Sequence, residues 1–195
     1  AVKSIRMILD QFGEIKDYSL HNAVICSNRR FNYEEVQDII TGASDDPDTD
    51  KIKTAFEAAS ALRKNRIEKG AVELDLPEME PVCAGDGSVT GMIKRVNNES
   101  HQMIEDCMLA ANRCVADLLE THGMPGPFRV HGEPDGTKKK DLVSYLALFE
   151  IGLSADFKRQ DLARIIEQVR GKRLSYIINL SILRSYKQAE YRLEN

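Results

Sequence analysis

The first part of the chain shows two patterns of apolar and polar residues that predict regular structure. In Ser4–Cys26, apolar and polar side chains alternate on either side of a Gly-containing turn at Gln11–Glu14, which is typical of a β-hairpin. In Tyr33–Ile40, apolar residues recur at helical spacing, Asn32 is a favourable N-cap, and Gly42 follows the last turn. We therefore expect a hairpin followed by a short helix.

Two longer helices are indicated further along the chain. Residues Lys51–Lys69 carry an apolar stripe at helical spacing, with Thr49 or Asp50 positioned to cap the first turn and Gly70 to end the last. The strongest helical pattern covers Asn98–Thr121. We expect its apolar stripe to be mostly buried, and this stripe consists of Ile104, Cys107, Met108, Ala111, Val115 and Leu118.

The remaining segments add short strands and three more helices. Strands are expected around Ala71–Leu76, Glu80–Cys83, Val89–Val96 and Phe128–His131, the second and third joined by a Gly-containing turn. Helices are expected near Thr137–Ile151, Lys158–Arg170 and Leu174–Tyr191. Together these elements predict an α+β fold in which mixed helices pack on short, mostly antiparallel strands.

The composition is that of a globular protein. The 195 residues are 42% hydrophobic and carry a net charge of −4, which gives enough apolar material for a core and too little charge for a disordered chain. No apolar run approaches the ~18 residues of a membrane-spanning helix, and no charged-then-apolar leader follows Ala1. We therefore expect neither a membrane segment nor a secretion signal.

The charges are distributed unevenly. A pI near 5.7 argues against a domain that holds nucleic acid by bulk charge alone. Residues 158–195 nevertheless carry nine Lys and Arg against four acidic residues. This basic stretch is either a solvated helix surface or a track for phosphate groups.

The four cysteines form no recognisable metal or disulfide pattern. None belongs to a Cys-x-x-Cys pair, and the histidines lie at no metal-ligand spacing. Cys107 and Cys114 are seven residues apart in a helical pattern, so we expect both to be small core residues. This usage is typical of a reduced, intracellular protein, and we expect a cytoplasmic one.

An acidic loop between the first two helices partly imitates a calcium-binding loop. Asp46, Asp48, Asp50 and Glu57 stand at positions 1, 3, 5 and 12, but Lys51 occupies position 6, where the loop requires Gly. We therefore interpret these carboxylates as groups stabilised by the start of the following helix, without a metal.

Three polar residues share one face of the long helix expected over Asn98–Thr121. His101, Glu105 and Asn112 are separated by four and seven residues. They are either a polar stripe at the edge of the core or a row that faces a ligand, and a carboxylate in such a row most often recognises a hydroxyl, such as a sugar 2′-OH.

Five segments, taken in order, resemble the motifs of one family. They are NRRFNYEEV (28–36), LRKNRIEKGAVELDLPE (62–78), SHQMIEDCMLAAN (100–112), FRVHGEPD (128–135) and LRSYKQAEY (183–191). In this order and spacing the chain resembles the RNB-domain exoribonucleases, the family of bacterial ribonuclease R and ribonuclease II. The segments do not separate these two types.

The resemblance implies hydrolytic 3′-to-5′ degradation of single-stranded RNA with Mg²⁺, in which metal ions activate water and steady the leaving oxygen. The family's aspartate run would precede the region that matches residue 1, and its arginine-bearing block would follow Asn195. We therefore expect residues 1–195 to be a partial RNB domain that holds no catalytic or metal-binding residue, binds no Mg²⁺ and is inactive alone.

The resemblance also implies RNA-binding residues. Tyr33 matches an aromatic residue that helps to hold the 3′-terminal nucleotide, and Glu105 matches a carboxylate that contacts its ribose. Leu74 falls where ribonuclease II-like members place a base-stacking Phe, and Leu offers no π-face. Further residues in matching motifs, to which we assign support or channel-lining roles, are Asn112, His131 and Arg184.

Two hypotheses follow for the function. The first is that the chain forms channel wall and nucleotide-binding elements of an exoribonuclease, and the alternative is a non-catalytic RNA-binding or interaction module with the same fold. In either case, a part of a larger domain exposes strand edges and apolar faces, so non-physiological self-association is expected.

Overall fold

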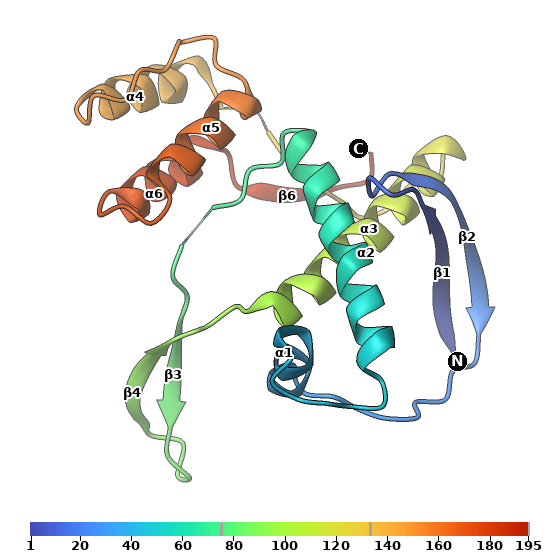
Figure 1. The fold of residues 1–195 in the computed structure, drawn as a ribbon. Helices are drawn as coiled ribbons and strands as arrows, with labels where there is room; N and C mark the ends of the chain where they lie inside the picture. Colours follow the sequence, from blue (N-terminus) through green and yellow to red (C-terminus); the bar gives the residue numbers. More distant parts are fainter. Residues whose placement is uncertain (75, 133, 195) are drawn as a thin grey trace. The chain divides into compact units, whose positions relative to one another are not determined.

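The computed structural model describes residues 1–74, 76–132 and 134–194, which form six helices and six strands. The chain divides into two compact units, residues 1–68 with 97–124 (unit 1) and residues 69–96 with 125–195 (unit 2). The described strands pair into three two-stranded antiparallel sheets. The predicted α+β class is therefore confirmed (Figure 1).

Unit 1 combines a β-hairpin with three helices. Its elements are β1 (Val2–Leu9), β2 (Ile15–Ala23), α1 (Tyr33–Thr41), α2 (Thr49–Glu68) and α3 (Glu99–Thr121). The predicted hairpin is confirmed, and its turn contains Gly13 with φ +74°. A Cβ on Gly13 would lie 2.1 Å from the carbonyl oxygen of Ala61 in α2, so the turn can approach this helix only because the residue is glycine.

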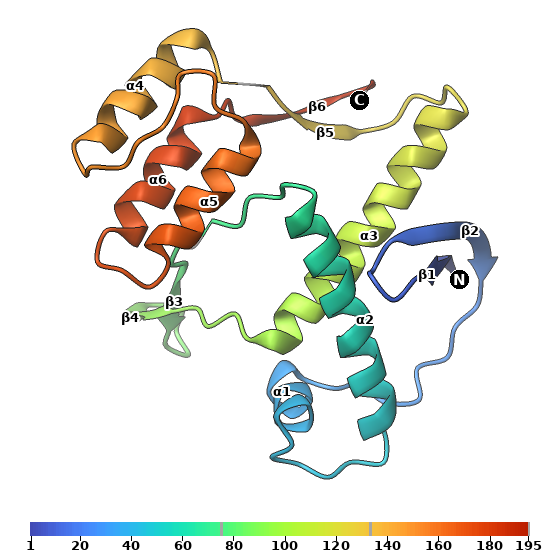
Figure 2. The same ribbon diagram turned by 45° about the horizontal axis from the view of Figure 1, so that its top comes forward.

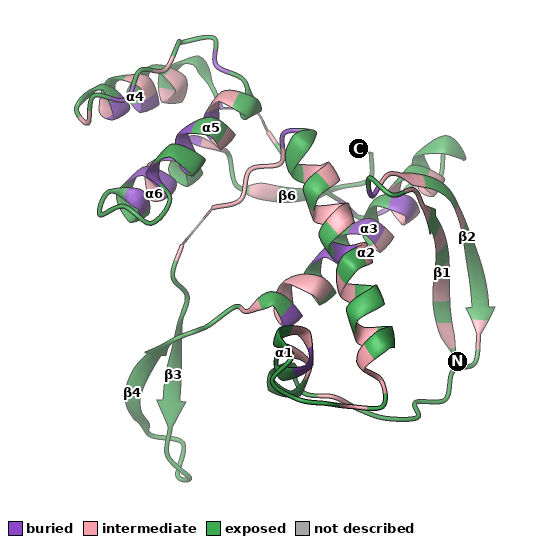
Figure 3. Cartoon of the chain, viewed as in Figure 1, coloured by how far each residue is buried: buried purple, intermediate pink, exposed green. Residues whose placement is uncertain are grey.

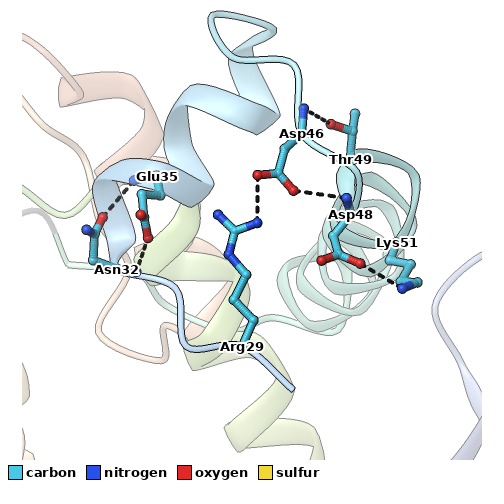
Figure 4. Close-up of polar contacts among 7 residues, drawn as sticks. All are labelled: Arg29, Asn32, Glu35, Asp46, Asp48, Thr49 and Lys51. Atoms are coloured by element: carbon cyan, nitrogen blue, oxygen red, sulfur yellow. Dashed lines mark hydrogen bonds and ion pairs between the residues drawn. The ribbon is translucent and has the colours of Figure 1, made fainter. Parts of the chain in front are cut away.

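The start of α1 is held by a capping box, as its sequence predicts. The side chain of Asn32 accepts a hydrogen bond from the backbone N–H of Glu35 at 2.8 Å, and the carboxylate of Glu35 accepts one from the backbone N–H of Asn32 at 2.8 Å (Figure 4). Gly42 ends the helix in the left-handed conformation. These caps make Tyr33 the first residue of α1.

The carboxylates of the acidic loop between α1 and α2 form ion pairs with basic side chains of the same chain (Figure 4). The carboxylate of Asp46 accepts hydrogen bonds from the backbone N–H of Asp48 at 2.9 Å and from the Arg29 guanidinium at 2.8 Å, and these interactions lower its pKa. The carboxylate of Asp48 pairs with Lys51. The predicted cap was wrong in detail, because α2 begins at Thr49 and so contains both Thr49 and Asp50.

Helix α3 buries a different face from the predicted one (Figure 3). Ile104 and Met108 are 41% and 60% exposed, and Cys107 is also exposed, whereas Ala110 and Cys114 are buried. The helix packs on α1 and α2. Small side chains such as Ala110 allow this close approach, while Val115 and Leu118 of the predicted stripe are half-buried.

Unit 2 contains a bundle of three helices and two pairs of strands (Figure 2). Its elements are β3 (Met79–Cys83), β4 (Val89–Lys94), β5 (Phe128–His131), α4 (Gly136–Ala147), α5 (Arg159–Val169), α6 (Ser175–Ser185) and β6 (Ala189–Arg192). The buried members of its apolar core are Leu142, Leu146, Ile151, Phe157, Leu162, Ile165, Ile166, Val169, Ile178 and Ile182. The hairpin of β3 and β4 agrees with the prediction, and every residue of both strands is exposed (Figure 3).

Two predicted elements of unit 2 differ in the structure. The strand expected over Ala71–Leu76 includes Asp75, which lies outside the described residues, and residues 71–74 and 76 form no strand. The last helix ends at Ser185 rather than Tyr191, because residues 189–192 pair with β5 as β6. The backbone groups of β5 require a strand partner, and this long-range pairing overrides the local helical pattern.

Candidate functional site

Tyr33 and His101 form a stacked aromatic pair in unit 1. Tyr33 is the first residue of α1, and His101 lies in the first turn of α3. Their ring centroids are 3.8 Å apart, with an angle of 15° between the ring planes. Tyr33 remains 43% exposed, so the imidazole covers part of its ring and leaves the rest open to a ligand.

Hydrogen bonds at the start of α3 hold this pair in place. The side-chain oxygen of Asn98 lies 2.6 Å from His101 Nδ1, and since a carbonyl oxygen can only accept, Nδ1 is the donor. In the neutral imidazole, Nε2 is then an acceptor. The buried Ser100 hydroxyl lies 2.8 Å from the carbonyl oxygen of Tyr33, which links the two helix starts directly.

Glu105 follows His101 by one helical turn and points outward, whereas its neighbour Asp106 points inward. Asp106 is 5% exposed and pairs with Arg66 of α2 at 2.9 Å. Glu105 is exposed, and within the described residues its carboxylate makes no hydrogen bond or ion pair. The Glu105 carboxylate is therefore available to a hydroxyl or another donor of a ligand.

The exposed face of α3 continues this site with polar and apolar side chains. Asn112 is exposed two turns beyond Glu105, and Met108 lies between them on the same side. The predicted row of His101, Glu105 and Asn112 is thus present on one face of one helix. Sequence reasoning did not find the contact of Tyr33 with this row, since a stacking contact between residues 68 positions apart leaves no local signal.

The other three predicted site residues belong to unit 2. Leu74 is half-buried and packs against the apolar core of the helices. His131 is the last residue of β5, with Nδ1 3.4 Å from the carbonyl oxygen of Lys187. Arg184, near the end of α6, is exposed. The structure therefore gives Leu74 a packing role, while His131 and Arg184 remain on the surface.

The site has the donor set of a ligand-binding surface and not that of a metal centre. Across residues 1–74, 76–132 and 134–194, no group of three or more His, Cys, Asp or Glu could hold a metal ion. Within the same ranges, no helix combines the length and the apolar character that a membrane crossing requires.

A stacked aromatic pair beside an exposed carboxylate is chemically suited to an organic ligand that offers a flat ring and a hydrogen-bond donor. The RNB domain family matches residues 1–195, and the chain belongs to this family. It is 29% identical over 201 residues to ribonuclease R of Thermotoga maritima and 28% identical over 202 residues to ribonuclease R of Aquifex aeolicus. Each match covers 98% of this chain and 28% of the relative, so the chain spans little more than a quarter of these proteins.

Solved structures give the same fold. The apo form of Mycoplasma genitalium RNase R superposes with a TM-score of 0.89 at 24% sequence identity. The match covers 99% of this chain and 32% of that one. The structure of the same RNase R in complex with ribose methylated single-stranded RNA matches equally well.

Proposed function

We propose that this chain forms RNA-channel wall and nucleotide-binding elements of a hydrolytic 3′-to-5′ exoribonuclease that degrades single-stranded RNA. The observation that supports this most directly is the exposed Tyr33 ring stacked on His101, one helical turn from the open carboxylate of Glu105. Relatives named ribonuclease R and a neighbour solved with single-stranded RNA support the same assignment.

Each group of the site has a distinct role in this proposal. The ring of Tyr33 contacts the terminal nucleotide, and stacking of this kind contributes about 1–3 kcal/mol per base. Glu105 accepts a hydrogen bond from a ribose 2′-OH, the group that distinguishes RNA from DNA. His101 positions the Tyr33 ring, while Asn112, His131 and Arg184 support or line the path of the strand.

Binding of single-stranded RNA to the 195-residue chain tests these roles. We expect Tyr33→Ala to weaken binding by about 1–3 kcal/mol and Tyr33→Phe to retain most of the affinity. Tyr176→Ala is the matched control, because Tyr176 is also half exposed, at 54%, but lies in unit 2. Fluorescence anisotropy with labelled oligouridylate measures the affinities.

The RNA-over-DNA preference tests Glu105 separately. We expect Glu105→Ala to lower this preference, with Glu57→Gln as the control, since Glu57 is an exposed carboxylate on α2. If neither Tyr33→Ala nor Glu105→Ala changes the affinity or the preference, the site is wrongly assigned.

The chemistry of the reaction belongs, in this proposal, to residues outside this chain. We propose that residues 1–195 are a partial RNB domain and that the complete protein binds Mg²⁺ through an upstream aspartate run. The span of about a quarter of the relatives' length supports this. The isolated chain should therefore produce no ladder from 5′-labelled single-stranded RNA with Mg²⁺, and progressive shortening would contradict the proposal.

The flanking reading frame decides between the two functions considered above. An upstream aspartate run and a downstream arginine block would support the exoribonuclease, and their absence would favour the non-catalytic RNA-binding module. We propose a cytoplasmic location for the complete protein, and fractionation of cells that express it tests this.

Exposed apolar surface supports self-association of the isolated chain. Val89, Met92 and Ile93 of β4 are each more than half exposed. Such a surface favours pairing between copies. Light scattering coupled to size exclusion should show a concentration-dependent mass, and a constant monomer mass would contradict this expectation.

A further inference from the structure

A pocket of about 620 Å³ in unit 2 gathers cationic side chains from several parts of the chain. Lys69 follows α2, Lys139 lies on α4, and Lys158 and Arg159 stand at the start of α5. The volume lies within the range of roughly 300–1,000 Å³ that is typical of ligand sites. None of these residues belongs to the site around Tyr33.

The charge of the lining favours an anion. Four cationic residues face one carboxylate, that of Asp156. Within the described residues, the ammonium groups of Lys139 and Lys158 form no ion pair. Lys139 Nζ lies 5.5 Å from the ring centroid of Phe157. The charges of these two lysines are therefore not neutralised by the protein.

Two aromatic residues of the pocket lining also contact the apolar core of unit 2. Phe157 is 7% exposed and belongs to the helical core, and Tyr186 packs against the same core. Gly70 has φ +92°, and a Cβ there would lie 3.3 Å from Gln160 Cγ. Lys139 is half-buried, so its field is screened less by water than that of a fully exposed lysine.

The lysines, rather than the backbone amides of α5, are the groups that would hold the anion. The carboxylate of Asp161 accepts a hydrogen bond from the backbone N–H of Lys158 at 2.8 Å, so a negative charge already stands at the start of α5 and disfavours an anion at the backbone amides there. Lysine ammonium groups are flexible point charges suited to backbone phosphates, which are contacted without regard to sequence.

We propose that Lys139 and Lys158 in this pocket bind a backbone phosphate of single-stranded RNA, at a contact separate from the Tyr33 and Glu105 site. This inference rests on the proposed function, since it takes RNA as the ligand. Lys158 is exposed to solvent, which fits a phosphodiester of a passing strand rather than a tightly held free phosphate.

The test is the salt dependence of oligouridylate binding to the 195-residue chain. We expect the double variant Lys139→Gln/Lys158→Gln to bind about tenfold more weakly at low salt and to reduce the slope of log K against log [NaCl] by about 0.7, the value for the loss of one phosphate contact. The control variant Lys140→Gln/Lys172→Gln removes two exposed lysines of unit 2 that do not line the pocket. It should change the affinity by less than about twofold.

The outcomes separate a failure of the pocket proposal from a failure of the proposed function. If the double variant matches the control while Glu105→Ala still weakens binding, the pocket proposal fails and the function stands. If the unmodified chain does not bind oligouridylate, both fail. Circular dichroism verifies folding, and the single variant Lys158→Gln at an exposed position repeats the test if the double variant is unfolded.

A titration with inorganic phosphate distinguishes the two sources of a phosphate group. If inorganic phosphate shifts the amide resonances of Lys158 and Tyr186 in the unmodified chain but the double variant binds RNA normally, the pocket serves free phosphate and the RNA proposal is overturned. If RNA and phosphate compete for these resonances and the double variant loses both, the proposal is supported.

Discussion

The two helical regions of this chain are stabilised in different ways. Helices α4, α5 and α6 enclose large aliphatic side chains, such as Leu146, Leu162 and Ile178, that are completely buried. Helices α1, α2 and α3 bury mainly small or polar groups, such as Ala59, Ser100 and Asp106, and leave large apolar side chains of α3 exposed. Burial of these large aliphatic side chains stabilises the packing of α4, α5 and α6. The packing of α1, α2 and α3 leaves one face of α3 exposed, where a ligand can bind.

The candidate nucleotide site lies in the more weakly buried region. Tyr33 and Glu105 can face a ligand because the outer side of α3 is not covered by unit 1. Binding sites often lie on the less stable parts of a protein, where groups remain free to interact. The following predictions test this contrast, beginning with the largest expected effect.

Truncation of Leu146 should produce the largest loss of stability. Leu146→Ala removes a completely buried side chain of α4 and should cost about 2–5 kcal/mol in the free energy of unfolding. Leu148→Ala, two residues later and 76% exposed, is the matched control and should stay within about 0.5 kcal/mol. Urea unfolding measures the free energy of unfolding of both variants, and hydrogen exchange shows which helices are destabilised. Equal effects of the two substitutions would show that burial of Leu146 does not stabilise the bundle of α4, α5 and α6.

The ion pair of Arg66 with Asp106 should be the largest single polar contribution between α2 and α3. Arg66→Met leaves the Asp106 carboxylate without this partner at 5% exposure, and we expect a loss of about 1–3 kcal/mol, less than for a completely buried pair because Arg66 is 31% exposed. The control is Arg164→Met, which removes an exposed ion pair on α5 and should cost less than about 1 kcal/mol. A stability change confined to α4–α6 would contradict the assignment.

Removal of the α1 cap should have a smaller effect that reaches the site. Asn32→Ala deletes one half of the capping box and should cost about 1 kcal/mol. Asn28→Ala in the preceding loop is the control. Because Tyr33 is the first residue of α1, the cap variant should also broaden the ring resonances of Tyr33, and unchanged resonances would show that the cap does not position this ring.

The smallest effect concerns the attachment of the hairpin to α3. Tyr18 donates a hydrogen bond to the Asp117 carboxylate at 2.6 Å, which raises the pKa of Tyr18 to about 12. Its pKa is raised in the folded state, so the stabilisation is complete below the unfolded value of about 10 and is lost as the pH rises to about 12. Absorbance at alkaline pH should show one late-ionising tyrosine that returns toward the ordinary value in Asp117→Asn, and no change in that variant would exclude the bond.

Local signals in the sequence predicted most of the elements. The capping box at Asn32, the hairpin around Gly13 and the long helix after Asn98 all depend on residues close together in the chain, and all are present. The row of His101, Glu105 and Asn112 could also be predicted, since helical spacing alone places these residues on one face. The RNB family motifs added Tyr33, although not its stacking on His101.

Contacts between distant segments decided which face of α3 is buried and where the last helix ends. The periodicity of α3 correctly predicted that Cys114 is buried, but it could not show that Ala110, rather than Ile104 and Met108, faces the neighbouring helices, because that choice depends on how closely α1 and α2 approach. The helix pattern before Tyr191 gave way to a strand, since β5 required a partner.

The sequence by itself determined the family, most of the elements and the cap of α1, because each depends on short-range chemistry or on residue identity. Only the tertiary structure placed Asp106 inward against Arg66 and left its neighbour Glu105 open, and only it packed Leu74 against the helical core. Burial depends on what lies opposite a side chain, and that partner is set by segments tens of residues away.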